Sequence, residues 1–190
     1  MAAFGPLGRS LAALIVAAAC AAHCRRGGGG VVDLNGHPAD PLASDAIGTV
    51  LVFVSTDCPI SNRYAPELRR LYQRYSPRGV AFLLVYPTAR DTPAMVRDHV
   101  REYSLPLQAV LDPFHVLVAR AKATTTPEAA VFARGGALVY HGRIDDRQVD
   151  FGVTRPEPTR RDVQDAVDAV LEGRAPEEKE ATPVGCAISR

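Results

Sequence analysis

One cysteine of the chain stands where a thiol becomes reactive. Val50 to Val54 is a continuous apolar run that predicts a buried strand, and Ser-Thr-Asp-Cys-Pro follows it at 55–59. Pro59 is well placed at the first position of a helix, so Cys58 lies at that helix's start. Unpaired backbone N–H groups and the helix dipole stabilise a negative charge there. The pattern indicates a thiolate nucleophile at Cys58, with a buried inert cysteine as the alternative.

The other cysteines limit the chemistry open to Cys58. Cys20 and Cys24 lie in an N-terminal segment that resembles a processed signal, and Cys186 follows Cys58 by 128 residues. No Cys-x-x-Cys pair is present, which argues against a structural zinc site. Cys186 is either a free tail cysteine or a resolving cysteine that attacks an oxidised Cys58, within one chain or across a dimer. In the second case we expect oxidation to join Cys58 and Cys186.

The polar residues near Cys58 have alternative roles. Ser61 either donates a hydrogen bond to the thiolate or is a solvated residue of the first helical turn. Thr56 and Asp57 are expected to cap the helix, but a carboxylate beside a thiolate raises the thiol pKa, so the effect of Asp57 stays open. We expect the tyrosines at helical spacing to be packing residues and His141 to be a surface or structural residue, and no ligand spacing joins the other three histidines (Tyr64, Tyr72, Tyr75; His37, His99, His115). Asp145–Arg147 is either a local salt-bridged turn or a segment that orders the loop beside the site.

Strands and helices alternate around this cysteine. Apolar spacing predicts a helix from Ile60 to Tyr75, kinked at Pro66, and a second buried strand from Val80 to Tyr86. An initial hairpin is expected at 31–36, helices over 91–103 and 114–121, strands over 107–111, 129–132 and 137–140, and a last helix capped by Thr159. This order predicts an α/β fold with a mixed central sheet and helices on both faces.

The composition suits one folded domain. The chain has 190 residues, 47% of them hydrophobic, and a formal net charge of +1. These values exclude a disordered chain and argue against nucleic-acid binding through bulk charge. We expect three segments: a signal- or lipoprotein-like segment with a Gly-rich tether at 1–30, the domain at 31–174, and a loosely held tail at 175–190 that carries Cys186.

The N-terminal segment predicts export. Arg9, a short apolar run over 11–22 and the small residues after it are typical of a secretory signal, and the run is too short to span a bilayer comfortably. Cys20 follows three alanines, as in a degenerate lipobox. The protein is then a membrane-anchored lipoprotein, a periplasmic protein without a tether, or a protein with an uncleaved anchor. Export places its thiols in an oxidising compartment.

Several motifs together resemble the redoxins, the AhpC/TSA-type, peroxiredoxin-like members of the thioredoxin fold. The stretch from Phe53 to Leu68 is similar to the active-site helix of that fold, including a proline eight residues after the cysteine. Thr126-Pro127 resembles the cis-proline that faces the reactive cysteine. Residues 31–36 and 107–113 resemble the redoxin hairpin and extra strand, and 139–146 and 184–188 resemble a bacterial group of peroxiredoxin-like thioredoxin-family proteins. The resemblance implies a thioredoxin-like fold in which a cis Pro127 contacts Cys58.

The chain departs from these relatives at defined positions. Ser61 stands where thioredoxins have their second cysteine, and Asn62 where a Sco-type copper site has one. Ser55 replaces the peroxiredoxin threonine and keeps a hydroxyl. No arginine between 128 and 132 matches the peroxiredoxin arginine. A peroxidase would lack part of its usual transition-state stabilisation here.

Residues and resemblance together predict a thiol-based oxidoreductase. Cys58 attacks a disulfide or a peroxide, Cys186 or an external thiol resolves the product, and Ser55, Ser61 and Pro127 complete the expected site. No organic cofactor or metal is implied. The expected partners are a disulfide- or peroxide-containing substrate and an external thiol reductant, with no nucleic acid. A periplasmic copper chaperone and a non-catalytic thioredoxin-fold binding protein are the alternatives.

Overall fold

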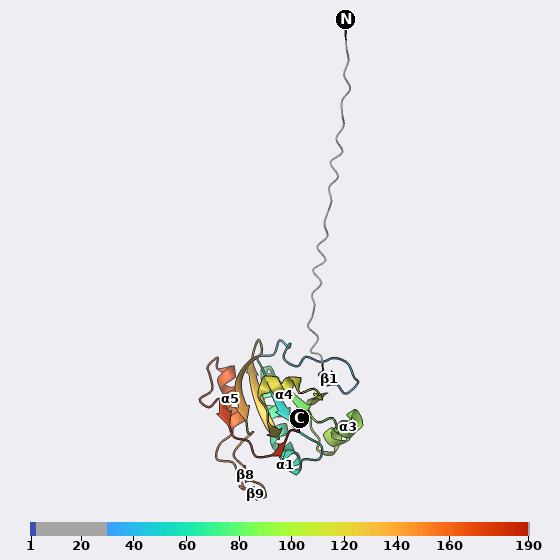
Figure 1. Cartoon of the computed structure of the whole chain (residues 1–190). Helices are drawn as coiled ribbons and strands as arrows, with labels where there is room; N and C mark the ends of the chain where they lie inside the picture. Colours follow the sequence, from blue (N-terminus) through green and yellow to red (C-terminus); the bar gives the residue numbers. More distant parts are fainter. Residues whose placement is uncertain (3–29, 190) are drawn as a thin grey trace.

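The computed structural model describes residues 1–2 and 30–189 (Figure 1). The predicted signal, Cys20, Cys24 and most of the Gly-rich tether lie outside these residues. None of the helices in the described part of the chain is long and apolar enough to cross a membrane.

A seven-stranded mixed sheet forms the centre of the protein. The strand order is β1 (Val32–Asp33), β4 (Gln108–Leu111), β3 (Val80–Tyr86), β2 (Gly48–Phe53), β6 (Glu128–Ala133), β7 (Ala137–Gly142) and β10 (Glu180–Ala181). β2 pairs with β3, β3 with β4 and β7 with β10 in parallel, whereas β1–β4, β2–β6 and β6–β7 are antiparallel. The predicted mixed sheet is confirmed.

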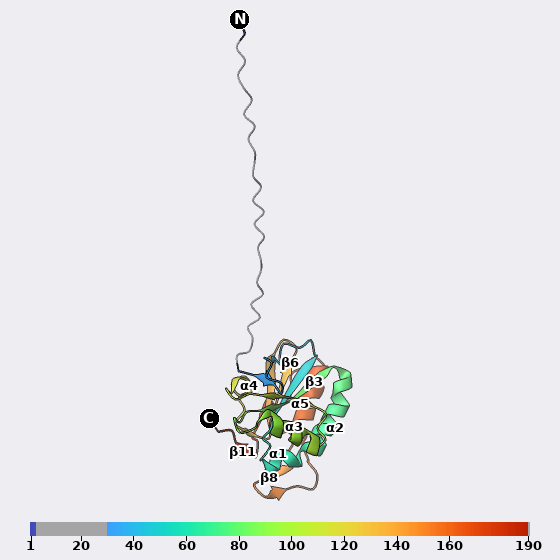
Figure 2. The ribbon, with the colours of Figure 1, turned by 90° about the vertical axis from the view of Figure 1, so that its right-hand side faces the viewer.

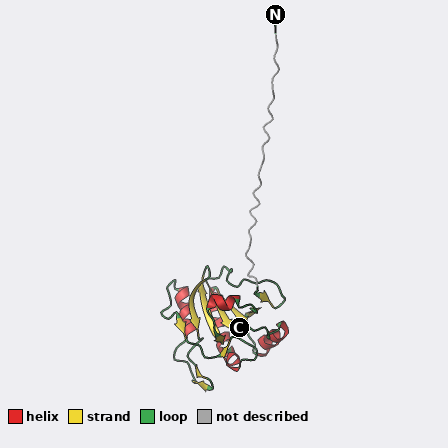
Figure 3. Ribbon diagram, in the orientation of Figure 1, coloured by secondary structure: helices red, strands yellow, loops and turns green. Residues whose placement is uncertain are grey.

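Helices cover both faces of this sheet (Figures 2 and 3). All residues of strand β2 are buried, and its successive side chains point to opposite faces of the sheet, where two hydrophobic cores lie. Val50 and Val52 belong to the first core, and Leu51 and Phe53 belong to the second. The first core also holds residues of α2 (Ala65–Tyr75), α3 (Pro93–Glu102) and α5 (Asp162–Leu171), and the second holds residues of α4 (Val116–Ala121).

The helix after Cys58 is divided in two. α1 spans Pro59–Arg63, and Tyr64 separates it from α2. Pro66 has no backbone N–H and so removes one hydrogen bond from a continuous helix, which explains the interruption. A 3₁₀ turn (Ser76–Arg78) follows α2 and ends at Gly79, which adopts φ +83°.

The expectation of a loosely held C-terminal tail is wrong. β10 joins the edge of the main sheet beside β7, and β11 (Cys186–Ala187) pairs antiparallel with β5 (Thr125–Thr126). We call residues 180–189 the C-terminal strap. Backbone hydrogen bonds to two separate strands hold it, so the strap is part of the folded domain.

Thr159 does not cap the last helix, which begins later, at Asp162. The Thr159 N–H instead donates to the Asp146 carboxylate at 2.7 Å, and its hydroxyl donates to the same group. Between β7 and α5 the chain also forms a small exposed hairpin, β8 (Gln148–Asp150) and β9 (Val153–Thr154), which was not predicted (Figure 1).

Candidate active site

Cys58 lies at the carboxyl end of a central strand, as predicted. β2 ends at Phe53, and the Val54 N–H donates to the Val85 carbonyl of the neighbouring strand at 3.0 Å. Cys58 is the N-cap residue of α1 with extended backbone (φ −87°, ψ 108°), and Pro59 is the first helical residue. The thiol is almost entirely buried, with 1% exposure.

Two carboxylates fix the loop between β2 and Cys58. The Ser55 hydroxyl donates to Asp57 Oδ1 at 2.5 Å, so its proton is directed away from the cysteine. Buried Asp91 accepts from the Thr56 N–H at 3.2 Å and from its hydroxyl at 2.5 Å. Burial raises the pKa of Asp91, and the bonds from Thr56 oppose this rise. Asp91 was not predicted, because nothing in the local sequence shows that this carboxylate is buried.

The loop at Pro127 faces Cys58. The Thr126–Pro127 peptide bond is cis, which confirms that expectation. The Cys58 Sγ lies 3.1 Å from the Thr126 carbonyl oxygen, to which the thiol can donate. Glu128 Oε2 organises this loop by accepting from the N–H groups of Thr124 at 2.8 Å and Thr125 at 3.1 Å.

The C-terminal strap brings Cys186 to the same place. In the β5–β11 ladder Cys186 is opposite Thr126, and Cys186 Sγ lies 3.0 Å from Cys58 Sγ. The Ile188 N–H donates to the Thr124 carbonyl at 2.9 Å. Figure 2 shows β11 close to α1. Two cysteines separated by 128 residues therefore meet through strand pairing.

Gly185 permits this close approach. A Cβ atom at residue 185 would lie 2.3 Å from the Thr126 carbonyl oxygen, well inside van der Waals contact. Any side chain at this position would push the strap away from β5. The residue before Cys186 is therefore restricted to glycine by the pairing that positions the sulfur.

The two thiols have opposite pKa shifts. Burial raises the pKa of Cys58, but hydrogen bonds from Cys186 and from Ser61 outweigh it, so the pKa of Cys58 is lowered overall. Burial raises the pKa of Cys186 to about 11, together with the hydrogen bond to Cys58, the Cys58 charge and the Asp57 charge. Cys58 is accordingly the more acidic thiol of the pair, and Cys186 lies where its S–H can donate to the Cys58 sulfur.

The Ser61 hydroxyl is buried and has no hydrogen-bond partner in the described chain. The Ser61 side chain and N–H lower the pKa of Cys58, and hydrogen bonding of this hydroxyl to the thiolate stays a prediction. The charge of Asp57, whose effect the sequence left open, acts on Cys186 and raises the pKa of that thiol.

We expect two separate thiol titrations in the full chain with Cys20→Ser and Cys24→Ser. One should lie below and one above the ordinary thiol pKa of about 8.5. Cys186→Ala removes a hydrogen-bond donor to Cys58, so the pKa of Cys58 should rise in that variant. The rate of iodoacetamide alkylation of each cysteine, followed against pH by mass spectrometry of the two peptides, gives both values. Coincident titration of both thiols near 8.5 would show that neither is perturbed.

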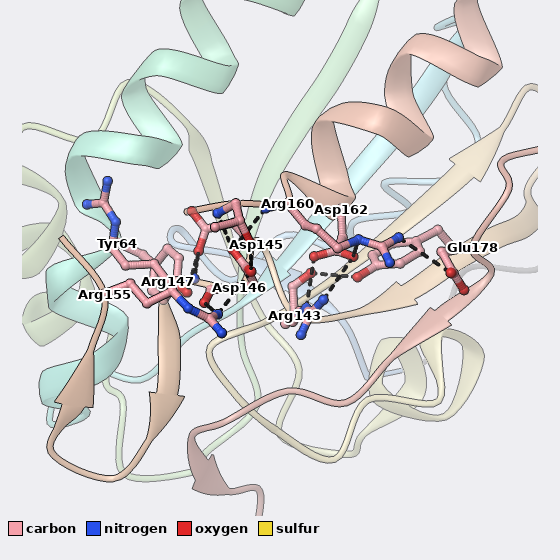
Figure 4. A network of polar contacts seen from close by, with 11 residues as sticks. Tyr64, Arg143, Asp145, Asp146, Arg147, Arg155, Arg160, Asp162 and Glu178 are labelled. Atoms are coloured by element: carbon pink, nitrogen blue, oxygen red, sulfur yellow. Dashed lines mark hydrogen bonds and ion pairs between the residues drawn. The ribbon is translucent and has the colours of Figure 1, made fainter. Parts of the chain in front are cut away.

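A polar network holds the loop beside α1 (Figure 4). The Tyr64 hydroxyl, at the junction of α1 and α2, donates to Asp145 Oδ1 at 2.8 Å. Asp146 accepts from Thr159 and Arg160, and it pairs with Arg155 at 2.9 Å. Burial raises the pKa of Asp146, but the bonds from Thr159 and Arg160 outweigh it and lower the pKa to about 2. This turn was predicted as salt-bridged, and its link to Tyr64 was not.

Two histidines near the site are held by polar neighbours. His99 is buried between the Tyr86 hydroxyl and the Asn62 amide oxygen, each at 2.8 Å. His141 lies 3.7 Å from both Glu128 and Glu180. Among the described residues, no group of three or more histidine, cysteine, aspartate or glutamate side chains is placed to hold a metal ion.

Fold and site define a thioredoxin-fold protein of the redoxin type. Residues 41–141 match the AhpC/TSA family, and the chain belongs to this family of thioredoxin-like thiol oxidoreductases. No curated protein matches the chain.

Solved structures share the fold. An uncharacterised conserved protein from Geobacillus kaustophilus is 26% identical with a TM-score of 0.69, over 85% of this chain and 87% of that one. A hypothetical protein from Sinorhizobium meliloti is 25% identical with a TM-score of 0.70, over 83% and 88%. A secreted disulfide oxidoreductase from Mycobacterium tuberculosis, described as homologous to DsbE, is 20% identical with a TM-score of 0.50, over 75% and 93%. At that identity the last likeness concerns the fold alone.

Proposed function

We propose that this protein is a thiol–disulfide oxidoreductase that cycles between a Cys58/Cys186 dithiol and a Cys58–Cys186 disulfide. The observation that carries the proposal is the Sγ–Sγ distance of 3.0 Å. A disulfide bond is about 2.05 Å long, so the two sulfurs need to approach by only about 1 Å. The lowered pKa of Cys58 supplies the thiolate that thiol–disulfide exchange requires.

The net reaction transfers two electrons. A disulfide RSSR accepts them and becomes two RSH molecules, while the sulfurs of Cys58 and Cys186 lose their two protons and form one S–S bond. In the reverse direction, two thiols reduce the Cys58–Cys186 disulfide. Both directions pass through a mixed disulfide between one of the two cysteines and the partner.

Peroxide reduction is the second candidate, favoured by the family match. The Cys58 thiolate would attack a peroxide oxygen, release water or an alcohol and become a sulfenic acid, which Cys186 would convert to the same disulfide with loss of water. The site supports disulfide exchange better, because the Ser55 hydroxyl is bonded to Asp57 and no arginine of the described chain donates to Cys58.

The proposal also places the reaction outside the cytoplasm. The charged start and short apolar run of residues 9–22 support export. The Mycobacterium tuberculosis protein with the same fold is described as secreted. Cell fractionation tests this part, and recovery of the protein in the cytoplasmic fraction would contradict it.

The stoichiometry of a single turnover tests the function. We expect reduced protein, with Cys20→Ser and Cys24→Ser, to release two thiols from each hydroxyethyl disulfide it consumes. Cys58→Ser should release one and keep the other half as a mixed disulfide, because no second sulfur can displace it. Release of a single thiol by both proteins would contradict a paired site. Oxidation by hydrogen peroxide far faster than by the disulfide would favour the second candidate.

A further inference from the structure

The two sulfurs differ in their access to solvent. Cys58 is 1% exposed beneath the C-terminal strap, whereas Cys186 is half-buried. Cys186 lines a surface pocket of about 200 Å³ together with residues that include Thr88, Arg90 and Ser189, and Cys58 is not part of its lining. The sulfur that a partner in solution can reach is therefore Cys186.

The strap must separate from β5 before Cys58 becomes accessible. The β5–β11 pairing and the Ile188 N–H bond to the Thr124 carbonyl hold it in place. A partner that approaches the folded protein meets Cys186 first, because none of these contacts needs to break for it to do so.

The chemistry of exchange favours the same sulfur. In thiol–disulfide exchange the sulfur with the lower thiol pKa is the better leaving group. Of the groups that lower the pKa of Cys58, the Ser61 side chain and N–H remain when Cys186 is in a mixed disulfide, so they stabilise the Cys58 thiolate that attack on Cys186 Sγ expels. Solvent access and leaving-group ability are independent arguments, and both favour Cys186 as the sulfur that is attacked.

We propose that an external thiolate enters through this pocket and attacks Cys186 Sγ of the oxidised protein. The inference rests on the proposed Cys58–Cys186 disulfide. The attack forms an RS–Sγ bond to Cys186, breaks the Cys58–Cys186 bond and leaves Cys58 as a thiolate. A second RS⁻ then attacks the bound RS sulfur, which releases RSSR and a Cys186 thiolate that takes a proton. This step reduces the oxidised protein, whereas the order predicted from sequence, in which Cys58 attacks the substrate and Cys186 resolves the product, concerns its oxidation.

The thiol can come from a small molecule or from a cysteine of a protein reductant, since both present the same sulfur. The experiment has one arm for each: glutathione in the first, a reduced thioredoxin in the second. Reaction with glutathione alone assigns the pocket to small thiols, and a much faster reaction with thioredoxin assigns it to a protein partner.

The site of attack is found by trapping the mixed disulfide. The full chain with Cys20→Ser and Cys24→Ser is oxidised with diamide and its disulfide mapped. Excess thiol is then added, exchange is stopped with acid at short times, and peptic peptides are analysed by mass spectrometry. We expect the added thiol on the Cys186 peptide, with Cys58 free. The added thiol on Cys58 would overturn the inference alone, whereas absence of the initial disulfide would overturn the proposed function as well.

A pocket variant gives a second, independent measurement. Ser189 is exposed at the pocket and makes no side-chain hydrogen bond in the described chain, so Ser189→Trp adds bulk there without removing a contact. We expect reduction of the disulfide to slow about ten-fold in Ser189→Trp. Gln73→Trp, the matched control, adds the same side chain at an exposed position of α2 that does not line the pocket and should match the parent. An unchanged rate in Ser189→Trp would show that the thiol arrives by another route.

Discussion

Replacing Cys58 with serine is expected to reduce glutathione-dependent turnover of hydroxyethyl disulfide by roughly 10²-fold or more. Cys58→Ser removes the thiolate that lies 3.0 Å from Cys186 Sγ, and with it the intramolecular step that closes the disulfide. Cys186 is then left without a neighbouring thiolate and without a second sulfur with which to form a disulfide. The turnover of hydroxyethyl disulfide should fall to the rate of an ordinary surface thiol at the same concentration.

Cys186→Ser provides the comparison for this loss. The variant keeps the Cys58 thiolate but removes the exposed sulfur, so turnover should fall to a similar extent. Its circular dichroism and thermal unfolding should match those of the parent, because serine is close to cysteine in size. Full turnover in either single variant would show that the two sulfurs do not act as a pair.

Gly185→Ala is expected to slow formation of the Cys58–Cys186 disulfide by roughly 10²-fold, since a displacement of about 1 Å is enough for such a loss. The new Cβ would lie 2.3 Å from the Thr126 carbonyl oxygen, so β11 must shift away from β5. The shift separates the sulfurs and uncovers Cys58. Iodoacetamide should therefore alkylate Cys58 faster in this variant, although disulfide closure is slower.

A second glycine provides the matched control. Gly173 ends α5 with φ +69°, and a Cβ there meets no atom within 4 Å. Gly173→Ala should therefore lower stability by about 1 kcal/mol through backbone strain while leaving disulfide formation unchanged. Equal disulfide rates in Gly185→Ala and the parent would contradict the role of the strap in positioning Cys186.

The sequence was sufficient to predict the half of the site that local patterns encode. A buried strand, a turn and Pro59 after Cys58 form a contiguous signal, because the strand pattern and the helix start lie next to each other in the chain. The cis Thr126–Pro127 bond followed from family resemblance and is confirmed. The two-sided burial of β2 also matches its uninterrupted apolar run.

The strap was not predictable by the same means. β10 and β11 have two residues each, too few for any hydrophobic period, and both pair with strands distant in sequence. Charged residues at 177–180 suggested a solvated tail. Gly185 was the available signal, because a glycine inside a strand often marks a close backbone approach.

Buried carboxylates were the other omission. Asp91 and Glu128 hold the two loops that face each other at Cys58, and the side chains of both residues are buried. Aspartate and glutamate are usually exposed, so composition alone assigns such residues to the surface. Their burial is compensated by backbone and hydroxyl donors from Thr56, Thr124 and Thr125, which only the folded structure identifies.

The connectivity of the oxidised protein tests the central claim most directly. The full chain with Cys20→Ser and Cys24→Ser is treated with diamide, digested without reduction and analysed by mass spectrometry. The account predicts one cross-linked peptide pair that contains Cys58 and Cys186, formed within a single chain at every protein concentration. Cys58 found only as a sulfinic acid or as an external mixed disulfide, with Cys186 still free, would contradict it.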